Sequence, residues 1–172
     1  VIHGIVENHD GIITVDSEMG RGTTFDIYLP ASEDAVETAQ PQKVDSRKSP
    51  GPLLFVDDDE DLVAIARRML KQLFGYEVFT AKNGNEAIEI YSRKANEIAL
   101  VILDLIMPEM GGGETFDRLR ELNPKVKVLL SSGYSLEGEA AEIMARGCDG
   151  FIQKPFDLDE LSGKILEVLD RK

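Results

Sequence analysis

Four aspartates are the residues of this chain best suited to chemistry. In "LLFVDDDEDL", residues 53–62, four apolar residues run directly into Asp57, Asp58 and Asp59, and Asp104 ends a second apolar run. Two unit charges about 4 Å apart repel by roughly 4 kcal/mol at an effective dielectric near 20, so converging carboxylates favour a cation among them. Mg²⁺ suits such a site, since it prefers oxygen ligands and commonly joins one or two carboxylates to a phosphoryl group. The alternative interpretation of the acidic run is a helix N-cap that favours the helix dipole.

Two further polar side chains follow apolar runs. Ser132 lies in "LLSSGYS" before Gly133, which has no side chain to obstruct a ligand, and Lys154 lies in "GFIQKPF" before Pro155. A hydroxyl and an ammonium group supply the hydrogen bond and the positive charge that a phosphoryl group needs. Together with the aspartates, Ser132 and Lys154 predict a site for phosphoryl transfer.

The elements that must position these residues alternate along the chain. Apolar runs near 53–56, 76–81, 99–103, 126–130 and 150–152 alternate with stretches of helical period. Runs without polar alternation are typical of strands covered on both faces, so we expect an α/β fold of five βα units around a doubly wound parallel sheet. In such a sheet the working groups gather at the carboxyl ends of the strands, and the flavodoxin-like order 2-1-3-4-5 places the first and third strands together.

Helical periodicity follows the acidic run directly. We expect the apolar stripe of that helix to consist of Leu62, Ile65, Ala66, Met69, Leu70 and Leu73.

Composition excludes several classes of function. The chain has 172 residues and a net charge of -13, so it would repel a nucleic acid backbone. One cysteine and two histidines cannot form an intrachain disulfide or a usual zinc site. No apolar run approaches the length of a membrane span, and we expect a cytoplasmic fragment without membrane contact. Because the chain begins with Val1 rather than Met, we expect a longer parent protein that could carry a membrane anchor.

Three segments differ in composition. Residues 31–52 are poor in large apolar side chains and end in "PGP", which is typical of a linker, and residues 53–172 contain the regular α/β pattern. In residues 1–30, "GIITVDSE" and "TTFDIYLP" flank "MGRG" and predict a β-hairpin. Because one face of this hairpin is apolar and its edges are free, we expect a homodimer through residues 1–30.

Residues 53–172 resemble a receiver domain of two-component signalling, through "VDDDE", "LDLIMPEMGG", "SSGY" and "GFIQKPF". The resemblance implies that Asp104 is the phosphoacceptor, which attacks a phosphohistidine and forms an acyl phosphate. Asp57, Asp58, Asp104 and the backbone carbonyl of Ile106 would hold Mg²⁺, while Asp59 would be only a helix cap.

The same resemblance implies how the phosphoryl group is bound and sensed. Ser132 and Lys154 would each contact a phosphoryl oxygen, and the Lys154–Pro155 peptide bond would be cis. Ser132 and Phe151 would form the conformational switch, although core packing explains Phe151 nearly as well.

Residues 1–30 resemble the last part of a histidine kinase ATP-binding domain, with "GRGTTF" matching its final glycine box. The other ATP-binding motifs are absent, so the fragment would bind no ATP and catalyse only its own phosphorylation and dephosphorylation. The resemblance implies a hybrid histidine kinase as the parent. Its partner would be the kinase's phosphohistidine domain or a histidine phosphotransfer protein.

Two alternative functions remain. A haloacid dehalogenase-like phosphatase also combines a strand-end aspartate, Mg²⁺ and a lysine, but its nucleophile lies in the first strand. A phosphorylation-independent interaction module would have the same fold with an idle site.

Overall fold

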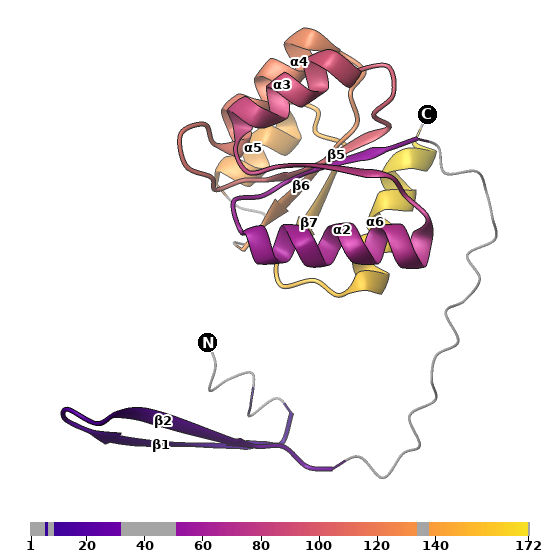
Figure 1. The fold of residues 1–172 in the computed structure, drawn as a ribbon. Coiled ribbons are helices and arrows are strands. Elements are labelled where there is room, and N and C mark those ends of the chain that lie inside the picture. The colour runs from indigo at the N-terminus through magenta and orange to yellow at the C-terminus, as the bar shows by residue number, and fades with distance from the viewer. Residues whose placement is uncertain (1–5, 7–8, 32–50, 134–137, 172) are drawn as a thin grey trace. The chain divides into compact units, whose positions relative to one another are not determined.

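Five short apolar runs pair as one parallel sheet in the computed structural model (Figure 1). The strands are β3 (Leu53–Val56), β4 (Val78–Ala81), β5 (Leu100–Asp104), β6 (Val128–Ser132) and β7 (Gly150–Gln153). Their order is β4-β3-β5-β6-β7, and every neighbouring pair is parallel. Counted in βα units this order is 2-1-3-4-5, which confirms the predicted flavodoxin-like α/β fold.

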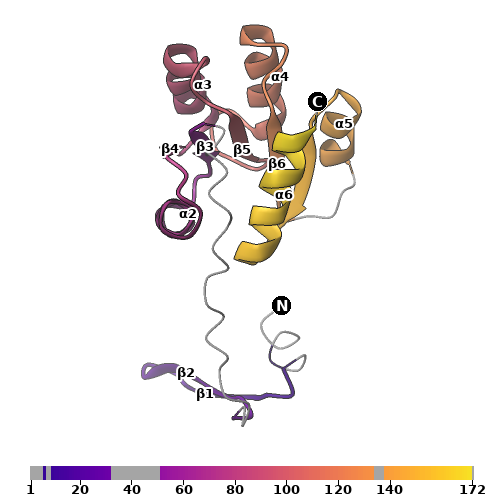
Figure 2. The same ribbon diagram turned by 90° about the vertical axis from the view of Figure 1, so that its right-hand side faces the viewer.

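Helices cover both faces of the sheet. They are α2 (Glu60–Phe74), α3 (Gly84–Lys94), α4 (Gly112–Leu122), α5 (Glu139–Ala145) and α6 (Leu158–Asp170). Helices α2 and α6 lie on one face, and α3, α4 and α5 lie on the other (Figures 1 and 2). Successive side chains of a strand point to opposite faces, so Leu54 belongs to the core beneath α3 to α5 and Phe55 to the core beneath α2 and α6. Burial on both faces explains why these runs show no polar alternation.

Helix α2 begins where the acidic run ends. The carboxylate of Asp59 accepts hydrogen bonds from the backbone N–H groups of Asp61 and Leu62 at 3.0 and 3.1 Å, so Asp59 is the N-cap. Gly75 ends the helix with a φ of 71°, a left-handed conformation that glycine adopts without steric cost. Asp59 is thus the residue of the acidic run that caps α2.

The predicted apolar stripe of α2 was wrong in part. Ala66 and Leu70 are buried as expected, but the side chains of Ile65 and Leu73 are 56% and 44% exposed. Helix α2 therefore buries a narrower face against the sheet than its apolar periodicity predicts.

The structure describes residues 6, 9–31, 51–133 and 138–171. The chain divides into two compact units whose boundary falls within residues 32–50, outside the described residues. Most of the predicted linker, residues 31–52, therefore lies outside what the structure describes. Within the described ranges, no helix has both the length and the apolar character needed to cross a bilayer.

The first unit contains the predicted hairpin. Strands β1 (Ile12–Glu18) and β2 (Gly22–Tyr28) pair antiparallel, with Val15 opposite Phe25 and Ile13 opposite Ile27. Residues opposite each other share a face of the hairpin, so these four apolar side chains lie together. Val15 and Phe25 are exposed in this unit.

Candidate functional site

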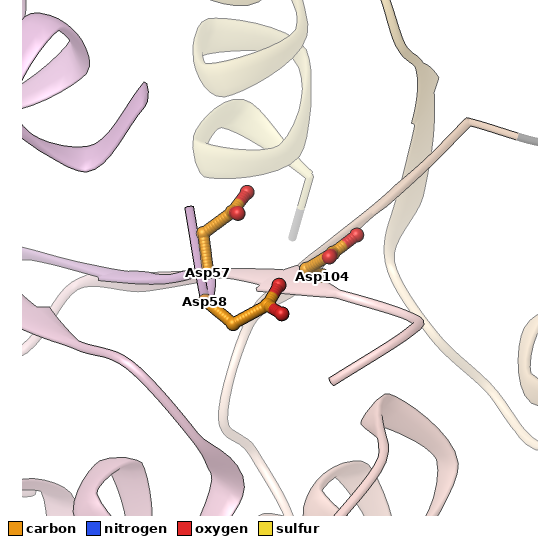
Figure 3. A group of neighbouring side chains, drawn as sticks. All are labelled: Asp57, Asp58 and Asp104. Atoms are coloured by element: carbon orange, nitrogen blue, oxygen red, sulfur yellow. The ribbon is translucent and has the colours of Figure 1, made fainter. Parts of the chain in front are cut away.

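The two central strands bring three carboxylates together. Asp57 directly follows β3, and Asp104 is the last residue of the neighbouring strand β5. Asp57, Asp58 and Asp104 each have a carboxylate oxygen that lies within 4.8 Å of the others (Figure 3). Asp57 and Asp104 are buried, whereas Asp58 is exposed. The cluster thus opens to solvent on the Asp58 side.

Lys154 reaches this cluster from the end of β7. Its Nζ lies 2.7 Å from Oδ2 of Asp57 and 3.0 Å from Oδ1 of Asp104. The backbone N–H of Lys154 donates to the carbonyl of Ser132 at 2.7 Å, which joins the ends of β6 and β7. The Lys154–Pro155 peptide bond is cis, as the resemblance implied. The predicted lysine therefore points at the acids.

Backbone groups fix the orientation of both buried carboxylates. The N–H of Asp59 donates to Oδ1 of Asp57 at 3.0 Å, and the N–H of Leu105 donates to Oδ1 of Asp104 at 3.0 Å. Both described contacts of the Asp104 carboxylate fall on Oδ1. Oδ2 of Asp104 makes neither of these two contacts.

Burial and the contacts between Lys154 and the acids act in opposite directions on the pKa of Asp104 and on that of Lys154. Burial raises the pKa of Asp104 above its ordinary value and Asp57 raises it further, while Lys154 and the Leu105 N–H lower it. Burial lowers the pKa of Lys154, but its contacts with Asp57 and Asp104 outweigh that effect and leave this pKa raised. Lys154 is thus held as a cation, and it partly compensates the two buried acids.

The remaining predicted residues surround this centre. Ser132 is buried at the end of β6, and Phe151 is half-buried against the core beneath α3 to α5. Ile106 has an exposed side chain in the loop between β5 and α4. The switch role of Ser132 and Phe151, and the ligand role of the Ile106 carbonyl, stay predictions.

Two further residues near Asp104 were not predicted from the sequence. Ser131 lies opposite Asp104 in the register of β5 and β6, and its buried hydroxyl has no hydrogen-bond partner among the described residues. A Cβ on Gly112 would lie 2.5 Å from the Asp104 carbonyl oxygen, so α4 approaches the strand end closely here. The repeated serine in "SSGY" and the glycine run before α4 were the available signals.

The donor set fits a hard divalent cation. Its members are carboxylates from adjacent strand ends, and one of them, Asp58, is accessible from solvent. Such oxygen ligands and partial openness suit Mg²⁺, which keeps part of its water shell. The geometry defines an acidic pocket at the carboxyl edge of a parallel sheet, with a lysine beside it.

The family of this chain follows from comparison with known proteins. The sequence model of the response regulator receiver domain matches residues 53–166, and the chain belongs to this family. The sensor kinase CckA of Brucella abortus is 34% identical over 180 residues, which cover 100% of this chain and 19% of that protein. The aerobic respiration control sensor protein ArcB of Escherichia coli K12 is 30% identical over 169 residues, covering 96% of this chain and 21% of that protein. The chain thus spans about a fifth of the length of these relatives.

Solved structures agree with the fold. The receiver domain of the hybrid histidine kinase CckA is 32% identical, with a TM-score of 0.59 over 70% of this chain and 100% of that one. The CheX-CheY-BeF3-Mg complex of Borrelia burgdorferi is 26% identical, with a TM-score of 0.63 over 71% of this chain and 91% of that chain. The prediction of a receiver domain is confirmed, and neither alternative function is favoured.

Proposed function

We propose that Asp104 accepts a phosphoryl group from a phosphohistidine in a phosphorelay. An oxygen of Asp104 forms a bond to phosphorus while the phosphorus–nitrogen bond to the imidazole breaks, and the electron pair stays on the histidine nitrogen. The product is an acyl phosphate on Asp104. The observation that carries this proposal is the position of Asp104, buried at a strand end, where Lys154 contacts both its carboxylate and that of the buried Asp57.

The surrounding residues bind and orient the phosphoryl group. Such transfer needs positioning and positive charge more than covalent help from the protein. Lys154 pairs with one phosphoryl oxygen, and the Ser132 hydroxyl donates to another and acts with Phe151 as the switch. Asp57, Asp58, Asp104 and the Ile106 carbonyl would hold Mg²⁺. The ion, when bound, would supply the positive charge that the equatorial oxygens require.

The wider organisation forms part of the same proposal. Residues 1–30 are the C-terminal fragment of a kinase ATP-binding domain, residues 31–52 a linker, and residues 53–172 the receiver. The parent is a hybrid histidine kinase, and the partner is its phosphohistidine domain or a histidine phosphotransfer protein. Two relatives named as sensor proteins, CckA and ArcB, support this organisation because they match this chain over 100% and 96% of its length.

The hairpin supports the proposed homodimer through residues 1–30. Val15 and Phe25 lie opposite each other and are 63% and 64% exposed within their unit. Pairing of two such faces would bury this apolar surface. Light scattering at micromolar concentration should give the mass of a dimer, and a monomer mass would rule out this contact.

Phosphorylation is tested by labelling with a small-molecule phosphodonor and Mg²⁺. The Asp104→Asn variant should incorporate no label, because the nucleophilic carboxylate is gone. Asp59→Asn is a matched control, since Asp59 belongs to the same acidic run but caps α2, and asparagine also serves as an N-cap. Labelling of Asp104→Asn at the wild-type level would refute the assignment.

Two assays separate the alternatives. Mg²⁺-dependent binding of beryllofluoride is expected of an active receiver and not of an idle interaction module. Steady turnover of a small phosphate ester would favour the phosphatase instead.

A further inference from the structure

The outer edge of β4 leaves main-chain groups that no described residue pairs with. Among the strands that the structure describes, β4 is the edge strand of this sheet and pairs only with β3. The N–H groups of Leu53 and Asp57 donate to the carbonyls of Glu77 and Ala81 at 2.8 and 3.0 Å, so these carbonyls point inward. Main-chain groups alternate in direction along a strand, and the N–H and C=O groups of the intervening Val78 and Thr80 therefore point away from the sheet.

Side chains close the far end of this edge. The backbone N–H of Lys82, next in the outward series, donates to the carboxylate of Glu86 at 2.8 Å. No such side-chain contact covers Val78 or Thr80 among the described residues. The open stretch therefore extends over the first three residues of β4.

Helices α2 and α3 flank β4 on its two sides (Figure 2). A groove lined by residues of both helices runs along the open stretch of β4. It consists of two adjoining hollows of about 310 and 490 Å³ that share Arg67, Val78 and Phe79. We call it the edge groove. Its lining residues are Arg67, Lys71, Gly75, Tyr76, Glu77, Val78, Phe79, Thr80, Ile90, Arg93 and Lys94.

The edge groove is basic although the chain has a net charge of -13. Its four cations come from both helices and face a single lining carboxylate, Glu77. Arg93 and Lys94 pair with Glu89 and Glu97, and Nζ of Lys94 also lies 4.6 Å from the centre of the Phe79 ring.

Two cations of α2, Arg67 and Lys71, have no ion-pair partner among the described residues. Both line the hollow beside Val78 and Phe79. Because these cations lie beside the open edge of β4, the groove matches an acidic strand in charge and can also form main-chain hydrogen bonds with it.

We propose that the edge groove binds an extended acidic peptide segment of a partner protein as an additional strand on β4. Val78 and Thr80 supply the main-chain hydrogen bonds, as in other cases of strand addition to a sheet edge. Successive side chains of an extended peptide point to opposite faces of the sheet, so a peptide with an acid at every second position places all its carboxylates on one face, where they can meet Arg67 and Lys71 of α2. Charged residues can also serve only to keep an edge strand from aggregating, and this alternative predicts no saturable binding.

The probe is a fluorescent peptide of about eight residues in which Glu and Val alternate, titrated into the full chain at about 0.1 M salt to screen weak attraction. Saturable binding should appear as a rise in fluorescence anisotropy. Hydrogen exchange of the Val78 and Thr80 amides, followed by NMR, should slow by about tenfold or more at saturation. A peptide with Lys in place of Glu should not bind.

Two variants separate strand addition from simple charge attraction. Thr80→Pro removes an outward N–H but no bond to β3, which an edge strand tolerates, and it should abolish binding. Arg67→Glu should weaken binding by about tenfold or more. Arg68→Glu is the matched control, because Arg68 is the next residue of α2 and lines a different hollow with Ile65 and Leu73, and it should change the affinity less than about twofold.

Any of three results would overturn the proposal. The first is the absence of saturable binding, and the second is an equal loss of affinity in Arg67→Glu and Arg68→Glu. The third is undiminished binding by a folded Thr80→Pro variant. Circular dichroism establishes whether Thr80→Pro is folded. If it is not, the two arginine variants and the amide exchange of the wild-type chain decide the matter.

Discussion

Replacing Lys154 with methionine should destabilise the receiver unit at neutral pH. Its Nζ contacts Asp57 at 2.7 Å and Asp104 at 3.0 Å, and both carboxylates are buried. Methionine keeps much of the side-chain volume but removes the positive charge. The variant therefore leaves two acids close together in a poorly solvated site.

The distances set the size of this effect. At an effective dielectric near 20, each contact corresponds to a gross attraction of about 6 kcal/mol, from which the desolvation of the ions must be subtracted. Removing one partner of a buried ion pair typically costs about 3–5 kcal/mol. The Lys154 side chain keeps 22% of its exposure, so we expect a loss of about 3 kcal/mol, at the lower end of that range. Such a loss leaves a domain with about 5–15 kcal/mol of stability folded.

The loss should depend on pH in a defined direction. Because the folded pKa of Lys154 is raised, its stabilisation is complete below the ordinary lysine pKa, about 10.4, and disappears only as the pH rises through the folded pKa. Asp104 takes up a proton early as the pH falls, because its pKa is raised. The difference between wild type and variant should therefore be full at pH 7 and shrink toward acid pH.

Urea unfolding monitored by circular dichroism measures this difference, with EDTA present to remove metal. Lys125→Met is the matched control, because it removes the same charge from an exposed position. If Mg²⁺ binds the acids as proposed, saturating Mg²⁺ should narrow the gap, because the variant, whose buried acids lack the lysine cation, gains more from the ion than wild type does; a ligand at 100 times its Kd adds about 2.7 kcal/mol. Equal stability of Lys154→Met and Lys125→Met at pH 7 would show that the ion pairs contribute nothing.

Two further changes test the surroundings of the phosphoacceptor. Without metal, Asp104→Asn should be more stable than wild type at neutral pH, because burial disfavours the ionised carboxylate; the gain in urea unfolding should shrink once the pH falls below the raised pKa of Asp104 and vanish below the ordinary aspartate pKa. Gly112→Ala should lower stability by about 1–3 kcal/mol, because its Cβ would lie 2.5 Å from the Asp104 carbonyl oxygen. Gly163→Ala in α6, where nothing lies within 4 Å of the added Cβ, should instead raise stability by up to about 1 kcal/mol.

The strands could be predicted from the sequence because they follow from short-range patterns, whereas their order, on which the gathering of acids depends, was expected from the flavodoxin-like fold. A run such as "ALVIL" without polar alternation indicates a strand covered on both faces, and Leu100–Asp104 is indeed the central strand β5. Parallel strands end at one edge of a sheet, so Asp57 and Asp104 had to approach each other once their strands paired.

The finer features depend on three-dimensional packing and could not be predicted in this way. Apolar periodicity placed Ile65 in the buried stripe of α2, but the rotation of a helix on a sheet is set by contacts with distant strands. The buried Ser131 hydroxyl, which has no hydrogen-bond partner in the described part of the chain, and the basic edge groove around Arg67 likewise arise only when separate elements meet.

The position of Lys154 connects metal binding with phosphorylation. In the unphosphorylated site its ammonium group already bonds to Asp57 and Asp104, and an ammonium has only three donors. A phosphoryl group on Asp104 would draw Lys154 toward its oxygens and leave Asp57 buried without its cation, which is costly unless another cation replaces it. Under the proposed mechanism, phosphorylation and Mg²⁺ binding should therefore favour each other, and by linkage each should strengthen the other to the same extent.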